Sequence, residues 1–324
     1  MHNNLITTAV GSYPKPPHLM EARAKAARAQ ISRDELMDLE KKATEHWIRL
    51  QEDLDMDILV DGEMYRGDMA TYFAENLEGM DISGLVRSYG NRYYRKPVAT
   101  GAIKRPKAIT VDWWKYSQSL TDRPVKGMLT GPYTIADWSF DEHFGSREAF
   151  VLNLARVINE EARDLQAAGC RYIQIDEPAA STRPEEMALV AEGLRVSTEG
   201  LDAVTITHIC YGDFATVFDG ILTLPVDVLD LEMANSDYHL LEYFEDKKTD
   251  KILALGVFDV HHHAPESIEA MEAGIERALN VLPGKQIWVT PDCGLKTRTE
   301  EESMAKLKNM MQATNNVRAR RGLS

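Results

Sequence analysis

Eight short apolar runs rich in β-branched residues recur along the chain, and amphipathic segments separate them. This alternation is typical of parallel βα units, because each return to a parallel strand requires a crossover long enough to hold a helix. Eight such units predict an α/β protein folded as a single closed (β/α)8 barrel, or TIM barrel. The strands are expected at residues 5–10, 57–61, 125–130, 171–176, 204–207, 226–231, 252–258 and 286–290.

The segments between the strands predict helices, because their apolar residues recur three and four positions apart. The clearest examples are residues 32–54, 146–169 and 265–284. The segment from about 79 to 107 breaks this rhythm, since it is rich in Gly, Arg and Tyr and carries only short alternating runs. We expect it to form a hairpin-like excursion after the second strand. No linker-like stretch divides the chain, which predicts one barrel domain over residues 1–324.

The charge balance limits the classes of partner. The formal net charge of −14 argues against nucleic acid, whose phosphates are bound by clustered Lys and Arg. The basic run 318–321 is expected to be the solvated end of a helix, where cations are favoured. The N-terminus lacks the basic and apolar regions of a signal peptide, and no apolar run reaches the roughly 18 residues of a membrane span. We therefore expect a cytoplasmic protein with no membrane partner.

The three cysteines cannot form a closed disulfide framework, and a reducing compartment would leave them as thiols able to bind metal. Cys170 precedes the fourth strand, at the opposite end from the other two. We expect it to be a small buried residue. Cys210 and Cys293, in contrast, each follow a strand. In a (β/α)8 barrel that end of the strands forms the open face where catalytic groups gather.

Two further metal-binding side chains, His208 and Glu232, also stand at strand ends. With Cys210 and Cys293 they offer one imidazole, two thiolates and a carboxylate, the donor types that Zn²⁺ prefers. Structural zinc usually has four protein ligands, so ligand count alone favours a zinc that only braces the barrel. The other charged residues at neighbouring strand ends favour a catalytic zinc instead, because a brace needs no such pocket.

Several longer motifs carry a resemblance to a known family. They are GSYP at 11–14, DGE at 61–63 followed by RGDM, SYGNR at 88–92, IQIDEPA at 173–179, THICYGDF at 207–214, GVFDVH at 256–261 and WVTPDCGLKTR at 288–298. Over nearly its full length the chain resembles the C-terminal catalytic half of cobalamin-independent methionine synthases, in a short stand-alone form. The resemblance implies methyl transfer to the sulfur of homocysteine to form methionine. It also implies a Zn²⁺ cofactor held by His208, Cys210, Glu232 and Cys293.

Zinc would serve this reaction because an alkyl thiol is mostly protonated at neutral pH, whereas a metal-bound thiol loses its proton. The amino-acid part of homocysteine needs two further anchors. Glu63 and Asp176 can hold its ammonium group, and Ser12 with nearby backbone N–H groups can hold its carboxylate. The resemblance implies the same contacts and adds Val10 and Gly11. If either Glu63 or Asp176 is considered alone, a salt bridge to an arginine of the barrel is the alternative to binding the substrate ammonium group.

The resemblance also implies that His261 donates a proton, and an imidazole with a pKa near 6.5 can supply one to a leaving amine. The adjacent His262 and His263 receive no role, and the run of three histidines is alternatively an adventitious metal site or a solvated loop.

Arg92, Tyr93 and Trp138 match positions that contact methyltetrahydrofolate in the family, and an aromatic side chain can stack on a planar pterin. The chain departs from full-length members in lacking their N-terminal barrel and in carrying Thr182 where they have a glutamate. The methyl donor is therefore expected to be either methyltetrahydrofolate or a methylcorrinoid, such as methylcobalamin or a corrinoid protein.

Two other functions are compatible with the pattern. One is a related zinc alkyltransferase that acts on another thiol, such as coenzyme M. The carboxylates Glu63 and Asp176 argue against it, because a sulfonate thiol has no ammonium group for them to bind. The other is a non-catalytic barrel that binds zinc or a thiol, which a turnover assay would distinguish from an enzyme.

Overall fold

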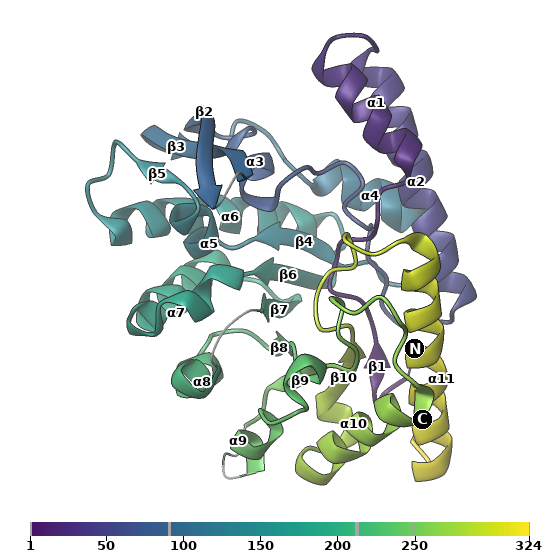
Figure 1. Cartoon of the computed structure of the whole chain (residues 1–324). Helices are drawn as coiled ribbons and strands as arrows, with labels where there is room; N and C mark the ends of the chain where they lie inside the picture. The colour runs from purple at the N-terminus through teal and green to yellow at the C-terminus, as the bar shows by residue number, and fades with distance from the viewer. Residues whose placement is uncertain (1, 90–91, 211–213, 246, 248, 324) are drawn as a thin grey trace. The chain divides into compact units, whose positions relative to one another are not determined.

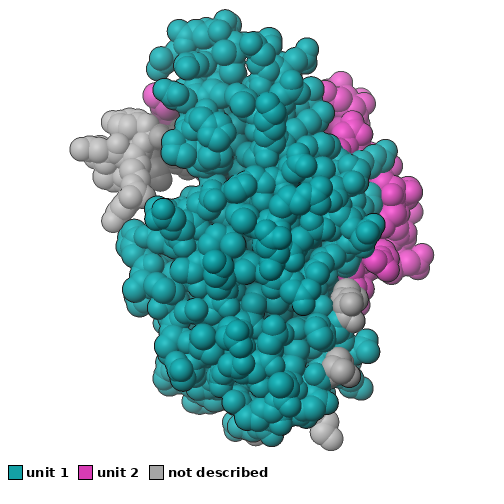
Figure 2. Space-filling model, turned by 90° about the vertical axis from the view of Figure 1, so that its right-hand side faces the viewer, with its two compact units in different colours: residues 1–65, 113–126, 228–324 teal, residues 66–112, 127–227 magenta. Residues whose placement is uncertain are grey.

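The computed structural model describes every residue except 1, 90–91, 211–213, 246, 248 and 324 (Figure 1). Side-chain positions are described for the same residues, apart from 87–89, 92–94 and 214–215. The chain divides into two compact units, coloured separately in Figure 2. Unit 1 comprises residues 1–65, 113–126 and 228–324, and unit 2 comprises residues 66–112 and 127–227.

Unit 1 contains four parallel strands in the order β1-β10-β9-β8. They are β1 (Ile6–Thr7), β8 (Val228–Leu231), β9 (Ile252–Gly256) and β10 (Ile287–Thr290). Residues 57–61 extend this sheet, because the Ile58 N–H donates to the Thr7 carbonyl over 3.0 Å. Leu59 in turn forms a parallel bridge to Val125. Unit 1 therefore holds the first, second, seventh and eighth predicted strands, the start of the third and all of the sixth except residues 226–227.

Unit 2 continues with three parallel strands in the order β4-β6-β7. They are β4 (Gly127–Thr130), β6 (Tyr172–Asp176) and β7 (Val204–Ile209). The Asp227 N–H donates to the Thr205 carbonyl over 3.0 Å, so the start of the predicted sixth strand lies beside the fifth. Within each unit, the predicted strands are thus hydrogen-bonded to one another in parallel and in the order expected for a (β/α)8 barrel.

Five of the described helices, α2, α3, α6, α10 and α11, begin at a residue whose side chain caps them. Ser32 starts α2 with a capping box to Glu35, and Thr299 starts α11 with one to Glu302. The α-helices are α1 (Pro17–Ala27), α2 (Arg33–Asp53), α3 (Met69–Ala74), α4 (Val111–Ser119), α5 (Pro132–Asp137), α6 (Arg147–Ala167), α7 (Met187–Ser197), α8 (Phe214–Leu222), α9 (Leu241–Glu245), α10 (Ile268–Val281) and α11 (Glu300–Arg321). Short 3₁₀ turns lie at η1 (Pro178–Thr182), η2 (Pro184–Glu186), η3 (Ala234–Ser236) and η4 (Gly284–Gln286).

The basic run at the end of the chain is confirmed as a helix end, but the expectation that it is solvated is wrong for Arg318, which is buried because it pairs with Asp57. The run closes α11, whose lower part lies beside α10 in Figure 1, and Arg320 and Arg321 pair with Glu276 on α10. Cys170 is also as expected. It is buried, its Sγ donates to the Tyr172 carbonyl, and burial raises the pKa of its thiol to about 12.

The predicted excursion is an antiparallel hairpin of β2 (Glu78–Tyr89) and β3 (Arg92–Lys104), and β3 also pairs with β5 (Phe140–Asp141). At its base Gly79 has a φ of +79°, and a Cβ there would lie 2.4 Å from the Ala102 carbonyl oxygen. This position therefore requires glycine. No helix among the described residues is long and apolar enough to cross a membrane. The single-domain organisation and the cytoplasmic location stay predictions.

Candidate active site at the strand ends

The first two predicted metal ligands lie at the carboxyl end of β7 in unit 2. His208 is in the strand and Cys210 follows it, and both are buried. Residues two apart on a strand point to the same face. Accordingly, their potential ligand atoms lie within 4.8 Å of each other. Together they supply one nitrogen and one sulfur donor, two of the donor types that zinc binds.

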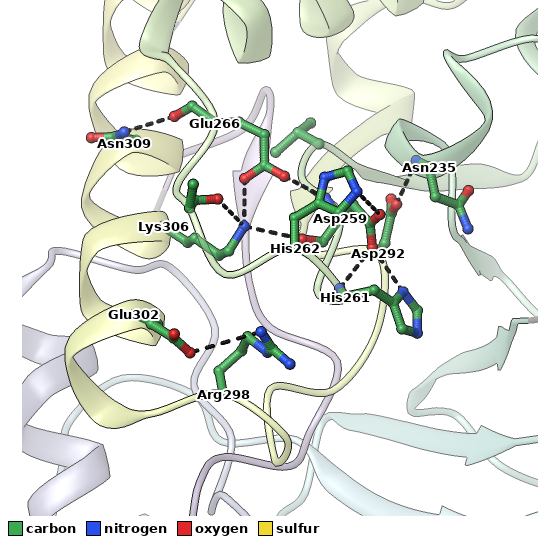
Figure 3. Close-up of polar contacts among 12 residues, drawn as sticks. Asn235, Asp259, His261, His262, Glu266, Asp292, Arg298, Glu302, Lys306 and Asn309 are labelled. Carbon is green, nitrogen blue, oxygen red and sulfur yellow. Dashed lines mark hydrogen bonds and ion pairs between the residues drawn. The ribbon is translucent and has the colours of Figure 1, made fainter.

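The other two predicted ligands belong to unit 1. Glu232 directly follows β8 and is buried, and Cys293 follows β10 and is half-buried. Asp292 connects their loops, because its carboxylate accepts backbone N–H groups from Met233 at 2.9 Å, Ala234 at 3.0 Å and Asn235 at 2.8 Å. Figure 3 shows the contact between Asp292 and Asn235.

Asp292 is fully buried, and burial raises the pKa of its carboxyl to about 7 even though the three N–H groups act to lower it. Its own N–H donates to the Phe258 carbonyl over 3.1 Å. One residue therefore joins the loops after β8, β9 and β10. Gly256 leaves room for it, since a Cβ at that position would lie 2.1 Å from an Asp292 oxygen.

The predicted substrate residues of unit 1 lie on loops that meet. Val10 and Gly11 are buried and Ser12 is half-buried. Ser12 forms a parallel bridge to Gly62, and its carbonyl accepts the Leu295 N–H over 2.7 Å. The loops after the first, second and eighth strands are thereby held together.

Glu63 has a left-handed backbone with a φ of +58°, an uncommon conformation for a residue other than glycine. Its N–H donates to the Asp61 carboxylate over 2.9 Å, and the Tyr65 hydroxyl donates to the same carboxylate over 2.9 Å. Strained residues of this kind cluster at functional sites. Asp176 is the last residue of β6 in unit 2, where it is buried and accepts a hydrogen bond from Gln174 at 2.7 Å.

The predicted proton donor, His261, lies in the loop after β9. Its Nδ1 is 2.8 Å from the Asp259 carboxylate, which also accepts the backbone N–H of His261 at 2.8 Å. Burial acts to raise the pKa of the Asp259 carboxyl, but the hydrogen bonds from His261 outweigh it and hold that pKa below its usual value. The side chains of His262 and His263 are 75% and 77% exposed. Within the described part of the chain, the three histidines do not gather into a metal-binding group.

The predicted methyl-donor residues all belong to unit 2. Arg92 and Tyr93 lie on β3, and their side chains fall outside the described ones. Trp138 is half-buried at the end of α5, where its N–H donates to the Thr134 carbonyl. Thr182 ends η1, and its hydroxyl donates to the Ala179 carbonyl over 2.7 Å.

The sequence model of the family described as cobalamin-independent synthase, catalytic domain, matches residues 5–316. The chain belongs to this family. It is 41% identical, over 98% of its length, to a 5-methyltetrahydropteroyltriglutamate–homocysteine methyltransferase from Shewanella oneidensis. A protein of the same name from Buchnera aphidicola is 38% identical over 97% of the chain. The chain spans about 43% of the length of these curated relatives.

Among solved structures, the chain is similar to a B12-independent methionine synthase from Shewanella sp. W3-18-1 in complex with selenomethionine. The TM-score is 0.87 at 26% identity, and the match covers 98% of both chains. The single (β/α)8 barrel expected from the sequence is therefore confirmed, as is the resemblance to the family.

Two buried acids of this member of the cobalamin-independent synthase family, Glu177 and Asp292, were not predicted as site residues from the sequence. Glu177 is fully buried and accepts N–H groups from Tyr133 at 3.0 Å and Thr134 at 2.7 Å, at the start of the helix that leads to Trp138. Its own N–H donates to the His208 carbonyl over 3.0 Å. Burial raises the pKa of its carboxyl to about 7. The only sequence signal was that each of the two acids directly adjoins a predicted site residue.

Proposed function

We propose that the chain is a zinc-dependent methyltransferase that transfers a methyl group from a 5-methyltetrahydropteroylglutamate to the thiol of homocysteine and forms methionine. The buried pair His208 and Cys210 at a barrel strand end carries the proposal. Relatives named as homocysteine methyltransferases support it. So does the related structure in complex with selenomethionine, the selenium analogue of methionine.

His208, Cys210, Glu232 and Cys293 would together hold the metal. Nitrogen and sulfur donors fit zinc, which also accepts carboxylate oxygen. Zinc, when bound, would hold the substrate sulfur in its nucleophilic thiolate form.

The residues around the metal ligands would orient the amino acid. Glu63 and Asp176 would bind the ammonium group, and Ser12 with adjacent backbone N–H groups would bind the carboxylate, with Val10 and Gly11 beside them. The bridge between Ser12 and Gly62 supports a shared site, because it holds the loops of Ser12 and Glu63 against each other.

Methyl transfer releases an amine nitrogen that must gain a proton. His261 would donate it, with Asp259 holding the ring through Nδ1.

The donor is proposed to be a folate rather than a corrinoid. The curated relatives are named for 5-methyltetrahydropteroyltriglutamate, and the family is cobalamin-independent. None of these comparisons supports the methylcobalamin alternative expected from the sequence. Arg92, Tyr93 and Trp138 would contact the pterin and its tail.

A donor panel tests this proposal. Zinc-loaded protein is mixed with homocysteine and, in parallel, with methyltetrahydropteroyl monoglutamate, methyltetrahydropteroyl triglutamate or methylcobalamin, and methionine is quantified. Coenzyme M replaces homocysteine in a second series. We expect methionine from the folates and no product from coenzyme M. Methionine formed from methylcobalamin and from neither folate would refute the assignment of a folate as the methyl donor. Tight homocysteine binding without any product would favour the non-catalytic barrel.

A further inference from the structure

Lys306 is a fully buried lysine on α11 whose contacts all go to one loop. Its Nζ donates to the Asp259 carbonyl at 3.0 Å, to the Ala264 carbonyl at 2.9 Å and to the Glu266 carboxylate at 2.7 Å. An ammonium group has three N–H bonds, so these contacts use every donor it has. All three acceptors lie between β9 and α10, in the segment that carries His261 (Figure 3).

A lysine in this position is costly for packing alone. Lysine is almost never fully buried unless it is paired, because its charge loses its hydration. Its neighbours on the buried face of α11, Leu307 and Met310, are apolar and fully buried. An apolar residue would therefore fill the space, and what Lys306 adds is its attachment to the loop.

Glu266 completes the attachment. One of its carboxylate oxygens accepts the Asp259 N–H at 3.1 Å, and the other accepts from Lys306. The peptide groups on both sides of the Asp259 Cα are thus fixed by one ion pair, in which Lys306 is buried and Glu266 is half-buried. The Phe258 carbonyl, just before them, accepts the N–H of Asp292 in the Cys293 loop.

Asp259, whose backbone is fixed in this way, in turn holds His261 by hydrogen bonds. The same carboxylate oxygen accepts the backbone N–H of His261 and lies 2.8 Å from its Nδ1. The other oxygen lies 3.7 Å from His262 Nε2, so the angle of the carboxylate decides which imidazole it holds. His261 is 44% exposed on its side chain, and such a side chain owes little of its orientation to packing.

We propose that Lys306 and Glu266 are positioning residues that fix the Asp259 carboxylate so that it holds His261 by Nδ1 and presents Nε2 for proton donation. The inference rests on the proposed function only in giving His261 the role of proton donor. The charged and titratable groups around the Asp259 carboxylate and backbone in these contacts are His261, His262, Glu266 and Lys306.

The test compares Glu266→Gln and Lys306→Met with a matched control, Asp57→Asn. Asp57 pairs with Arg318, also on α11 and also buried, but contacts residues near the N-terminus instead of the His261 loop. Imidazole NMR of the protein without substrates reports the Nδ1–H signal of His261. We expect that signal to broaden or vanish in both loop variants and to persist in Asp57→Asn.

Kinetics supply the second measurement. General acid catalysis is worth about 100-fold to 10,000-fold, so a misplaced acid should lower kcat about 10-fold to 100-fold in Glu266→Gln, with the KM for homocysteine within about twofold. In a His261→Asn background, Glu266→Gln should cost nothing more. An unchanged His261 signal in Glu266→Gln, or a loss of kcat that adds in full to that of His261→Asn, would overturn the proposal. If Lys306→Met does not fold, Glu266→Gln decides alone.

The NMR result separates this inference from the proposed function. A chain that forms no methionine but loses its His261 signal in Glu266→Gln would refute the function and keep the positioning role.

Discussion

The substitution Gly256→Ala tests whether Asp292 organises the loops of unit 1 that carry the proposed metal ligands Glu232 and Cys293. The added Cβ would lie 2.1 Å from an Asp292 carboxylate oxygen and 2.9 Å from the Asp292 Cα, and the second contact involves backbone that cannot rotate away. Overpacking of this kind typically costs about 1–3 kcal/mol. If the carboxylate turns aside, each lost bond from a backbone N–H to the charged group adds about 1.5–3 kcal/mol. With one such bond lost, we expect a total of about 3–6 kcal/mol.

The assay combines thermal unfolding with metal analysis. At this chain length each kcal/mol lowers the melting temperature by about 1–2 °C, so a fall of roughly 3–12 °C is expected. Zinc content should fall as well, because the loops of Glu232 and Cys293 lose the group that joins them. Gly84→Ala is the control, since no atom lies within 4 Å of its added Cβ. A Gly256→Ala protein with the stability and zinc content of the wild type would refute the role given to Asp292.

Three further substitutions have distinct outcomes. Asp176→Asn should raise the KM for homocysteine about 10-fold to 100-fold, because an ammonium–carboxylate hydrogen bond is worth about 1.5–3 kcal/mol, and zinc content measured alongside should not change. Trp138→Ala should raise the KM for the folate about tenfold and leave homocysteine binding intact, and equal weakening of both would contradict stacking on the pterin. Burial acts to raise the pKa of Asp57, but backbone N–H groups and Arg318 hold it below its usual value. Its contribution to stability is therefore complete above pH ~4 and lost as the pH falls through the folded pKa, so acid titration should destabilise wild type more steeply than Asp57→Asn.

The fold was readable from the sequence because each strand is a short buried run between amphipathic helices. The burial of every residue of β4, β6 and β8 is the source of that signal. The predicted ends of the strands were less accurate where a strand pairs with its neighbour over only a few residues. The first strand was expected over residues 5–10 but β1 spans only Ile6–Thr7, and residues 57–61 pair through single bridges and hydrogen bonds.

The supporting side chains of the site were beyond sequence reasoning for a physical reason. Asp292 binds backbone groups 57–59 residues away, Glu177 binds groups 43–44 residues away, and Lys306 reaches Asp259 across 47 residues. No local periodicity encodes such contacts. Candidate site residues that follow strands could be predicted because parallel strands of a barrel end on one face, whereas the acids that contact their loops are recognisable only once the loops are folded.

The most direct measurement of the central claim is transfer of an isotopically labelled methyl group from methyltetrahydropteroyl triglutamate to homocysteine, by the same protein before zinc removal, after zinc removal and after zinc is restored. We predict labelled methionine with about one zinc per chain, none after removal, and recovery when zinc is returned. Cys293→Ser should bind little zinc and form no product under any of these conditions. Full activity of the zinc-free wild-type protein would contradict the account.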